Sequence, residues 1–365
     1  MTQSTTTVGP PSPGGTTREL AAHDRQSAPK GHHLLVRGKG GWLLAAVVVL
    51  VLVCAASLTI GARGMSLETV WQALTRFNPD DGNHAVVHSR IPRTVLGLVA
   101  GSALGLAGAA MQGVSRNPLA DPGIMGVNAG AALAVVAGIY LFGISGASGY
   151  IWFAFVGAAA AAVVVYLIAS MGRGGATPVK LALAGAALSA GLYSLMNVIL
   201  VSSQDTLDRF RFWQVGGIAG SDWSVVLTGL PFLLLGALIV LGSGRILNGL
   251  ALGDDVARGL GQNVVLARGV TALGIVLLCG SATALAGPIG FVGLVVPHAV
   301  RFFTGPDYRW ILPFSMVLAP ALLLASDVLG RVVMLPSEVP AGIMTAIVGA
   351  PVFVWLVRRG KGASL

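Results

Sequence analysis

Residues Gly269–Phe303 read GVTALGIVLLCGSATALAGPIGFVGLVVPHAVRFF, and this stretch decides how the chain is built. Its apolar run is too long for one membrane-spanning helix, because the hydrocarbon core of a bilayer is about 30 Å thick and a spanning helix needs about 20 residues. The proline within Gly287–Gly290 lacks an amide proton and clashes with the preceding helical turn. We therefore expect a spanning helix before this break and a short half-helix, Phe291–Phe303, after it.

The composition identifies lipid as the surroundings of most of the chain. Of its 365 residues, 55% are hydrophobic and only 10% are charged, which excludes an ordinary soluble domain. The net charge of +9 does not indicate a nucleic-acid partner, because Lys and Arg are scattered between apolar runs. The two cysteines, Cys54 and Cys279, lie far apart within such runs, so we expect neither a disulfide nor a metal site.

A series of uncharged runs predicts the membrane spans. The runs are Trp42 to Ala62, Thr94 to Ser115, Pro122 to Gly172, Leu181 to Gln204, Trp223 to Gly244, Gly269 to Pro297, Trp310 to Ser326 and Val339 to Val357. Two of them are long enough to hold two helices each. The run from Pro122 divides at the glycine-rich turn Gly143–Gly149, and the run from Gly269 divides at Gly287–Gly290.

The distribution of basic residues decides whether the half-helix crosses the membrane. Ten crossings place most of the 23 Lys and Arg residues on one side, whereas nine crossings divide them almost evenly. Cytoplasmic loops are enriched in Lys and Arg, so ten crossings with both termini cytoplasmic are favoured. A half-helix is tolerated only where protein or a cavity covers it, and such breaks mark the transport region of many carriers.

These patterns predict an all-α, multi-pass protein of the cell (inner) membrane. Residues 1–41, rich in Thr, Pro, Gly and Ser, are expected to form a disordered cytoplasmic tail. Residues 42–359 form the ten-span domain, and residues 360–365 form a second cytoplasmic tail. Five spans separate the second from the seventh, so matching segments of the two halves would cross in opposite directions.

Motifs for covalent chemistry are missing from the sequence. The phosphate loop GxxxxGK[ST], HExxH and GxSxG are absent, so we expect no enzyme activity, no catalytic residue, no cofactor and no bound metal. An ion-coupled secondary carrier would place carboxylates within its spans. Only Asp327 lies in one, four residues before Arg331, where a helical ion pair is the simpler interpretation. A secondary carrier and a purely structural membrane subunit stay open as alternatives.

Two polar segments between spans are candidates for gating and partner contact. The first, Arg116–Pro122, is a compact loop in which Pro118 and Pro122 favour the end of one helix and the start of the next. The second, Leu252–Gly261, begins with acidic residues and suits a short helix bounded by glycines. Leu252, Val256 and Leu260 would share one face of that helix. An apolar face outside the membrane needs a partner protein.

Several separated motifs resemble the FecCD/BtuC-type permease family of ABC importers. They are Arg90-Ile91-Pro92-Arg93, Met111-Gln112, Asn117–Pro122, Gly287–Leu294 with Pro297-His298 and Arg301, Leu335-Pro336 and Gly349–Phe353. The resemblance covers about Trp42 to Arg359. It implies a ten-span fold with inverted halves and a permease dimer, made of two copies or of two homologous permeases. It also implies two cytoplasmic ATPase subunits and an extracellular substrate-binding protein, which we expect to be a lipoprotein.

The resemblance also implies a cargo and roles for particular residues. The cargo would be a ferric siderophore, with haem or cobalamin as alternatives that one chain does not distinguish. Docking of the binding protein would fall to Arg90, Arg93 and Arg331, since a guanidinium group holds a carboxylate by two parallel hydrogen bonds. The dipeptide Ile91-Pro92 is expected to be extended and to hold the first two arginines outside the second span.

Coupling and gating residues follow from the same resemblance. Coupling to the ATPase would fall to Leu252, Gly253, Asp254, Asp255, Val256, Ala257, Arg258, Gly259, Leu260 and Gly261. The pore or gate would be formed by Gln112, Asn117, Leu119 and Thr177. Pro178 and Val179 stand where family members often carry small hydroxyl residues, so Thr177 is a substitute there. The glycines and alanines from Gly97 to Gln112 would either line the pore or let helices pack closely.

Overall fold

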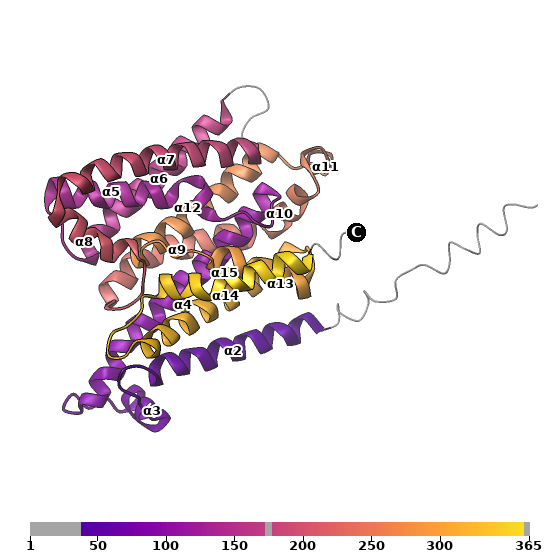
Figure 1. The fold of residues 1–365 in the computed structure, drawn as a ribbon. Helices are drawn as coiled ribbons and strands as arrows, with labels where there is room; N and C mark the ends of the chain where they lie inside the picture. The colour runs from indigo at the N-terminus through magenta and orange to yellow at the C-terminus, as the bar shows by residue number, and fades with distance from the viewer. Residues whose placement is uncertain (1–37, 172–176, 361–365) are drawn as a thin grey trace, which may run out of the picture. The chain divides into compact units, whose positions relative to one another are not determined.

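The computed structural model describes residues 38–171 and 177–360, and these residues form helices and loops without a strand. The expected tails therefore fall almost wholly outside the described residues. The chain divides into two units, Met1–Trp42 and Leu43–Leu365. The arrangement described below is that of the second unit (Figure 1).

The described helices follow one another with short connections. In chain order they are α2 (Lys39–Thr59), α3 (Leu67–Thr75), α4 (Gly82–Ser115), the 3-10 helix η2 (Pro122–Met125), α5 (Val127–Phe142), α6 (Ala147–Ser170), α7 (Pro178–Ser202), α8 (Gln204–Gln214), α9 (Trp223–Gly242), α10 (Gly244–Ala251), α11 (Asp254–Gly259), α12 (Val264–Ala286), α13 (Val292–Thr304), α14 (Tyr308–Val333) and α15 (Ala341–Gly360).

Both breaks predicted from glycine and proline are confirmed. Helix α5 ends at Phe142, where Gly143 takes a left-handed backbone with φ 62°. Helix α12 ends at Ala286, where Gly287 has φ 70°, and α13 begins only at Val292. With 13 residues, α13 is about 20 Å long at 1.5 Å per residue, which is shorter than the bilayer core.

Within the described residues, seven helices are long and apolar enough to cross a membrane: α2, α4, α6, α7, α9, α12 and α14. Three shorter apolar helices accompany them, Val127–Phe142, Val292–Thr304 and Ala341–Leu356. Together these segments coincide with the predicted runs. The crossing of the three shorter helices, and with it the count of ten spans, stays a prediction.

The helix of the second span begins earlier than predicted. Ile91 and Pro92 lie inside α4, which begins at Gly82, so this dipeptide is helical and not extended. Asp81 caps the additional turns, because its carboxylate accepts a hydrogen bond of 2.8 Å from the amide of Asn83. Packing against α3 also stabilises these turns, in a small apolar cluster that contains Val87.

Helix α4 lies at the centre of the packing, against α12, α13 and α14. In the most apolar 18-residue stretch of α4, 78% of the residues are buried. The corresponding share is 11% for α2 and 17% for α7, so those two helices leave most of their surface to lipid or another protein. A side chain at Gly101 would collide with the backbone of Pro320, and one at Gly108 with the backbone of Gly293. The small residues of α4 therefore serve close helix packing within this chain.

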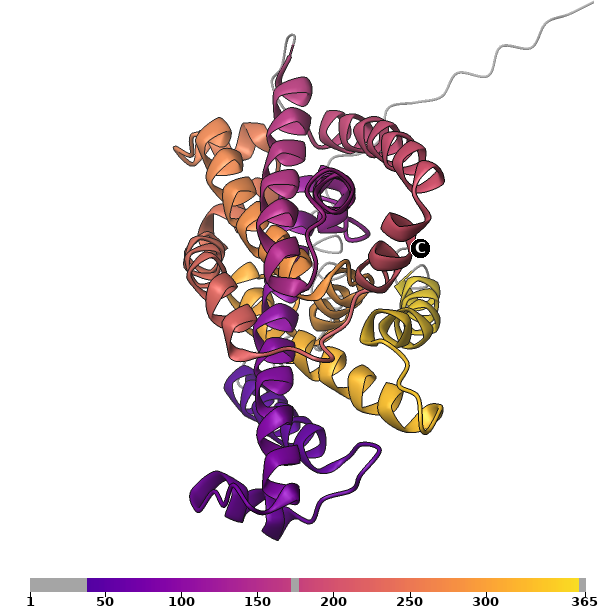
Figure 2. The same cartoon turned by 90° about the vertical axis from the view of Figure 1, so that its left-hand side faces the viewer.

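The length of α4 separates two ends of the molecule. Figure 1 shows α3 and the start of α4 on one side and α10 and α11 on the other, and the α3 end faces the viewer in Figure 2. From Arg93 to the last residue, Ser115, α4 spans about 33 Å, which matches the thickness of the bilayer core. We call these ends the α3 end and the α11 end.

Candidate docking and coupling sites

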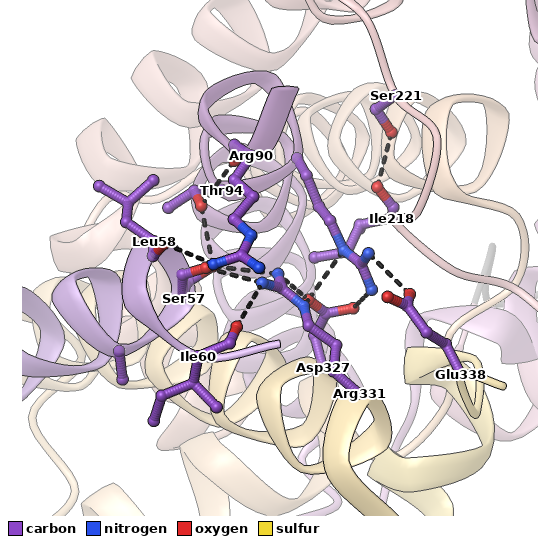
Figure 3. A network of polar contacts seen from close by, with 12 residues as sticks. Ser57, Leu58, Ile60, Arg90, Thr94, Ile218, Ser221, Asp327, Arg331 and Glu338 are labelled. Carbon is purple, nitrogen blue, oxygen red and sulfur yellow. Dashed lines mark hydrogen bonds and ion pairs between the residues drawn. The ribbon is translucent and has the colours of Figure 1, made fainter. Parts of the chain in front are cut away.

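The three arginines predicted for docking come together at the α3 end, and Figure 3 labels two of them, Arg90 and Arg331. Arg331 of α14 is 1% exposed. Its Nε and Nη2 donate to Asp327 Oδ2 at 3.0 and 2.5 Å, which confirms the ion pair expected from the four-residue spacing. Its Nη1 donates to the carbonyl oxygens of Ser57 and Ile60 at 2.6 and 3.2 Å, so Arg331 joins α14 to the end of α2.

Arg93 of α4 is the second arginine on the same carboxylate. Its Nε donates to Asp327 Oδ2 at 3.0 Å and its Nη2 to Oδ1 at 2.8 Å, a bidentate pair. Its Nη1 donates to Glu338 Oε2 at 2.8 Å. The side chain of Asp327 is 1% exposed and that of Glu338 is 36% exposed. Arg93 therefore has one buried partner and one partner at the surface.

Arg90 binds backbone instead of a carboxylate. Its Nη1 donates to the carbonyl of Leu58 at 2.8 Å and its Nη2 to that of Arg63 at 2.6 Å. The side chain is 9% exposed, and it fastens α4 to the last turn of α2 and to the loop that follows. We call Arg90, Arg93, Asp327, Arg331 and Glu338 the arginine cluster; it carries three positive and two negative charges.

The geometry of the arginine cluster gives its arginines different surroundings. Arg90 and Arg331 are turned inward, and a partner protein could reach them only if their present contacts were exchanged. Arg93 contacts the exposed Glu338. Sequence reasoning missed Glu338 as a member, because nothing in the sequence connects it to an arginine 245 positions earlier.

A cavity of about 790 Å³ opens beside the arginine cluster. Arg93, Asp327 and Glu338 form part of its wall. Arg209 and Arg211 of α8 also line it, together with the C-terminal end of α12 and the segment before α15. No sequence pattern predicted this cavity, because its walls come from segments that are distant along the chain.

The α11 end presents the predicted coupling segment, Leu252–Gly261. Glycines bound its helix as expected, since Gly253 and Gly261 have φ of 117° and 80°. The helix α11 itself covers only residues 254–259. Ala257 is fully buried and packs in a cluster with Leu250 and Val264, which attaches α11 to α10 and α12.

The apolar face of the coupling segment points away from the chain. Leu252, Val256 and Leu260 are 66%, 48% and 65% exposed. On the same segment, Arg258 pairs with Asp255 across one turn at 2.9 Å. All three side chains are exposed as expected, but only Val256 lies within α11, because Leu252 precedes this helix and Leu260 follows it. The shared face and its ATPase partner stay predictions.

The residues predicted for the gate lie in three separate environments. Gln112 is 1% exposed, and its Nε2 donates to the carbonyl of Leu294 at 3.2 Å, between α4 and α13. The side-chain oxygen of Asn117 accepts from the amide of Leu119 at 2.9 Å, and Leu119 is 45% exposed. Thr177 caps α7 by accepting from the amide of Lys180 at 3.4 Å.

A carboxylate at the start of α14 fixes a further contact at the α11 end. The side chain of Arg309 hydrogen-bonds Asp307 and, with help from Asn248, lowers the pKa of this carboxyl to about 2. Asn248 Nδ2 donates to Asp307 Oδ1 at 2.7 Å, and Asn248 Oδ1 accepts from the amide of Tyr308 at 2.8 Å. These reciprocal bonds join α10 to α14.

The fold defines a class: a helical membrane protein with several helices long and apolar enough to cross a bilayer. A model of the FecCD transport family matches residues 49–359, and the chain belongs to this family. It is 43% identical over 321 residues to the "Probable siderophore transport system permease protein YfiZ" of Bacillus subtilis, covering 87% of this chain and 96% of the relative.

Two further comparisons agree. The chain is 45% identical over 316 residues to the ferric enterobactin transport system permease protein FepD of Escherichia coli, covering 86% of this chain and 93% of the relative. A solved structure of a metal-chelate type ABC transporter in an inward-facing conformation superimposes with a TM-score of 0.77 and 29% identity. That match covers 88% of this chain and 99% of the other.

Proposed function

We propose that this chain is the membrane permease subunit of an ABC importer for iron chelates, above all ferric siderophores. The observation that carries the proposal is the match to siderophore and ferric enterobactin permeases over nearly the whole of both chains. The sequence lacks a phosphate loop, so ATP hydrolysis belongs to two separate ATPase subunits. Haem and cobalamin are the alternative cargoes.

The assembly follows from the exposed surfaces. Ten spans, with α13 as a half-helix and the two halves inverted, would place both termini in the cytoplasm. Only 17% of the residues in the most apolar stretch of α7 are buried. The exposed surface of this helix is available to a second permease, either a copy of this chain or a homologue. The α3 end faces outward in this topology, and the α11 end faces the cytoplasm.

The outer docking site is centred on Arg93. Arg93 is held in place by the buried Asp327, while its contact with Glu338 lies at the surface. A carboxylate of the extracellular binding protein can take the place of Glu338 without disturbing the buried pair. Arg90 and Arg331 then support Arg93 by fixing α4 and α14 to the end of α2.

The coupling segment docks on the ATPase at the cytoplasmic end. Its exposed Leu252, Val256 and Leu260 suit the helix-in-groove mode of recognition. Asn117, Leu119 and Thr177 lie in the loops at this end and form the gate, with Gln112 behind them between α4 and α13. ATP binding and hydrolysis would open and close the pathway alternately on the two sides.

The alternative of an ion-coupled carrier is weakened by the state of Asp327. Its carboxylate accepts four hydrogen bonds from Arg93 and Arg331. A carboxylate neutralised in this way is not available to bind a proton or cation during transport.

The cargo class is tested in cells that lack their own iron-chelate permeases. We expect expression of this chain, with its ATPase and binding protein, to restore uptake of ⁵⁵Fe supplied as a ferric siderophore. Uptake of haem or cobalamin in place of the ferric siderophore would support one of the alternative cargoes. Uptake that survives loss of the ATPase and collapses with an ionophore would support a secondary carrier.

A further inference from the structure

One carboxylate joins the coupling segment to the inner ends of two central helices. Asp254 is the first residue of α11. Its Oδ1 accepts from Arg268 Nη2 of α12 at 2.8 Å and also pairs with Arg116 Nη2. Asp254 is 26% exposed, and Arg268 is 8% exposed. The bridge is therefore partly buried between α11, α12 and the end of α4.

Arg116 occupies the point where the chain leaves α4 and enters the Arg116–Pro122 loop. It is the C-cap of α4, with a left-handed backbone of φ 50°, which a residue with a side chain rarely adopts. Its Nε donates to the carbonyl of Leu250 at 2.7 Å. The next residue, Asn117, shapes the loop by accepting from the amide of Leu119. A displacement of Arg116 would therefore also move Asn117 and Leu119, which follow it in the loop.

Apolar packing attaches α11 to α10 and α12 but not to α4. The buried Ala257 contacts residues of α10 and α12, whereas the contact of Asp254 with Arg116 leads to α4. The charges make this contact more than a hydrogen bond. Asp254 stands between two guanidinium groups, so neutralising it leaves two positive charges facing the same gap, where they repel each other.

We propose that Asp254 is a positioning residue that transmits movement of the ATPase-bound coupling segment, through Arg116, to the Asn117–Leu119 loop, and through Arg268 to α12. The proposal rests on the proposed function of the chain as an ABC permease. It assigns the step between ATP hydrolysis and gate movement to a single ion-pair bridge. The exposed apolar side chains of the coupling segment bind the ATPase, and Asp254 moves the gate.

The test uses the complete importer in proteoliposomes, with both ATP hydrolysis and ⁵⁵Fe-siderophore uptake measured. Asp254→Asn keeps the shape of the side chain and removes its charge. The number of chelates transported per ATP hydrolysed should fall by about tenfold, while the complex still assembles and hydrolyses ATP. Asp205→Asn, which breaks an exposed Asp–Arg pair on α8 at the other end, should leave the ratio unchanged.

Reversal of the charges separates signal transmission from a general loss of stability. The triple variant Asp254→Arg with Arg116→Asp and Arg268→Asp reverses both ion pairs and places one base between two acids, and it should recover most of the lost ratio. If Asp254→Asn does not assemble, Asp254→Cys with Arg116→Cys in a chain lacking Cys54 and Cys279 gives a second route. Bridging the new cysteines with a short bis-methanethiosulfonate reagent should restore the ratio.

The outcomes separate this proposal from the function on which it rests. Absence of ATP-driven uptake by the unmodified importer would refute the proposed function. Uptake by the unmodified importer, together with an unchanged ratio in Asp254→Asn or no recovery on charge reversal or bridging, would overturn the role of Asp254 alone.

Discussion

Removal of the Asp327 carboxylate is the perturbation whose size the structure defines most closely. In Asp327→Ala, the guanidinium groups of Arg93 and Arg331 lose their shared counter-ion in a site where the aspartate is 1% exposed. Breaking a buried ion pair on one side typically costs about 3–5 kcal/mol, because a charge is left buried without compensation. Two arginines depend on Asp327, so we expect a loss in the upper part of that range.

Glu338→Gln is the matched control, since it removes a carboxylate from the same arginine at the surface. The Glu338 side chain is 36% exposed, and an exposed pair of this kind contributes about 0–1 kcal/mol. A second variant, Asp327→Ala combined with Arg331→Met, removes one of the stranded charges and should recover part of the loss.

The assay is reversible unfolding in mixed micelles of a mild detergent and sodium dodecyl sulfate, followed by circular dichroism. Asp327→Ala should lower the free energy of unfolding several times more than Glu338→Gln does. Equal losses in the two variants would refute the reasoning that Asp327 is the buried centre of the arginine cluster.

Three further predictions concern the two ends. Arg93→Lys keeps the charge but loses the bidentate fork that holds Asp327 while a third donor stays available at the surface. Binding-protein association should therefore weaken on the order of tenfold in surface plasmon resonance, and an unchanged Kd would remove Arg93 from docking. Val256→Asp with Leu260→Asp should abolish uptake while membrane insertion persists, because both side chains are already exposed; retained uptake would argue against the docking face. The Asp307 pKa of about 2 lies below the ordinary aspartate value of 3.8, so its contribution to stability is present above about pH 4 and is lost as pH falls toward about 2. Asp307→Asn should flatten that part of the stability–pH curve, and an unaltered curve would contradict the assignment.

Local sequence patterns predicted the helices and their breaks because both depend on neighbouring residues. Apolar runs mark the spans, and Gly143 and Gly287 end helices where their backbones turn left-handed. The same logic placed the start of α4 too late. It treated Arg90, Pro92 and Arg93 as signs of a helix boundary, whereas capping by Asp81 and packing against α3 extend the helix past them.

Contacts between distant residues could not be read from the sequence. The four-residue spacing of Asp327 and Arg331 gave their pair, but Arg93 joins it from 234 positions away. In the same way, Arg116 and Asp254 each stood out in a separate segment, and only the folded chain brings them together. The inward orientation of Arg90 and Arg331 likewise depends on where α2 ends against α4 and α14.

Measuring which energy source drives uptake is the most direct test of the central claim that this chain is an ABC import permease. Proteoliposomes holding the chain with its ATPase, and with the binding protein loaded with ferric siderophore outside, should accumulate iron only when ATP is sealed inside. Vesicles with the chain alone should neither hydrolyse ATP nor accumulate iron. Iron accumulation by the chain alone, driven by an ion gradient and indifferent to ATP, would contradict the account.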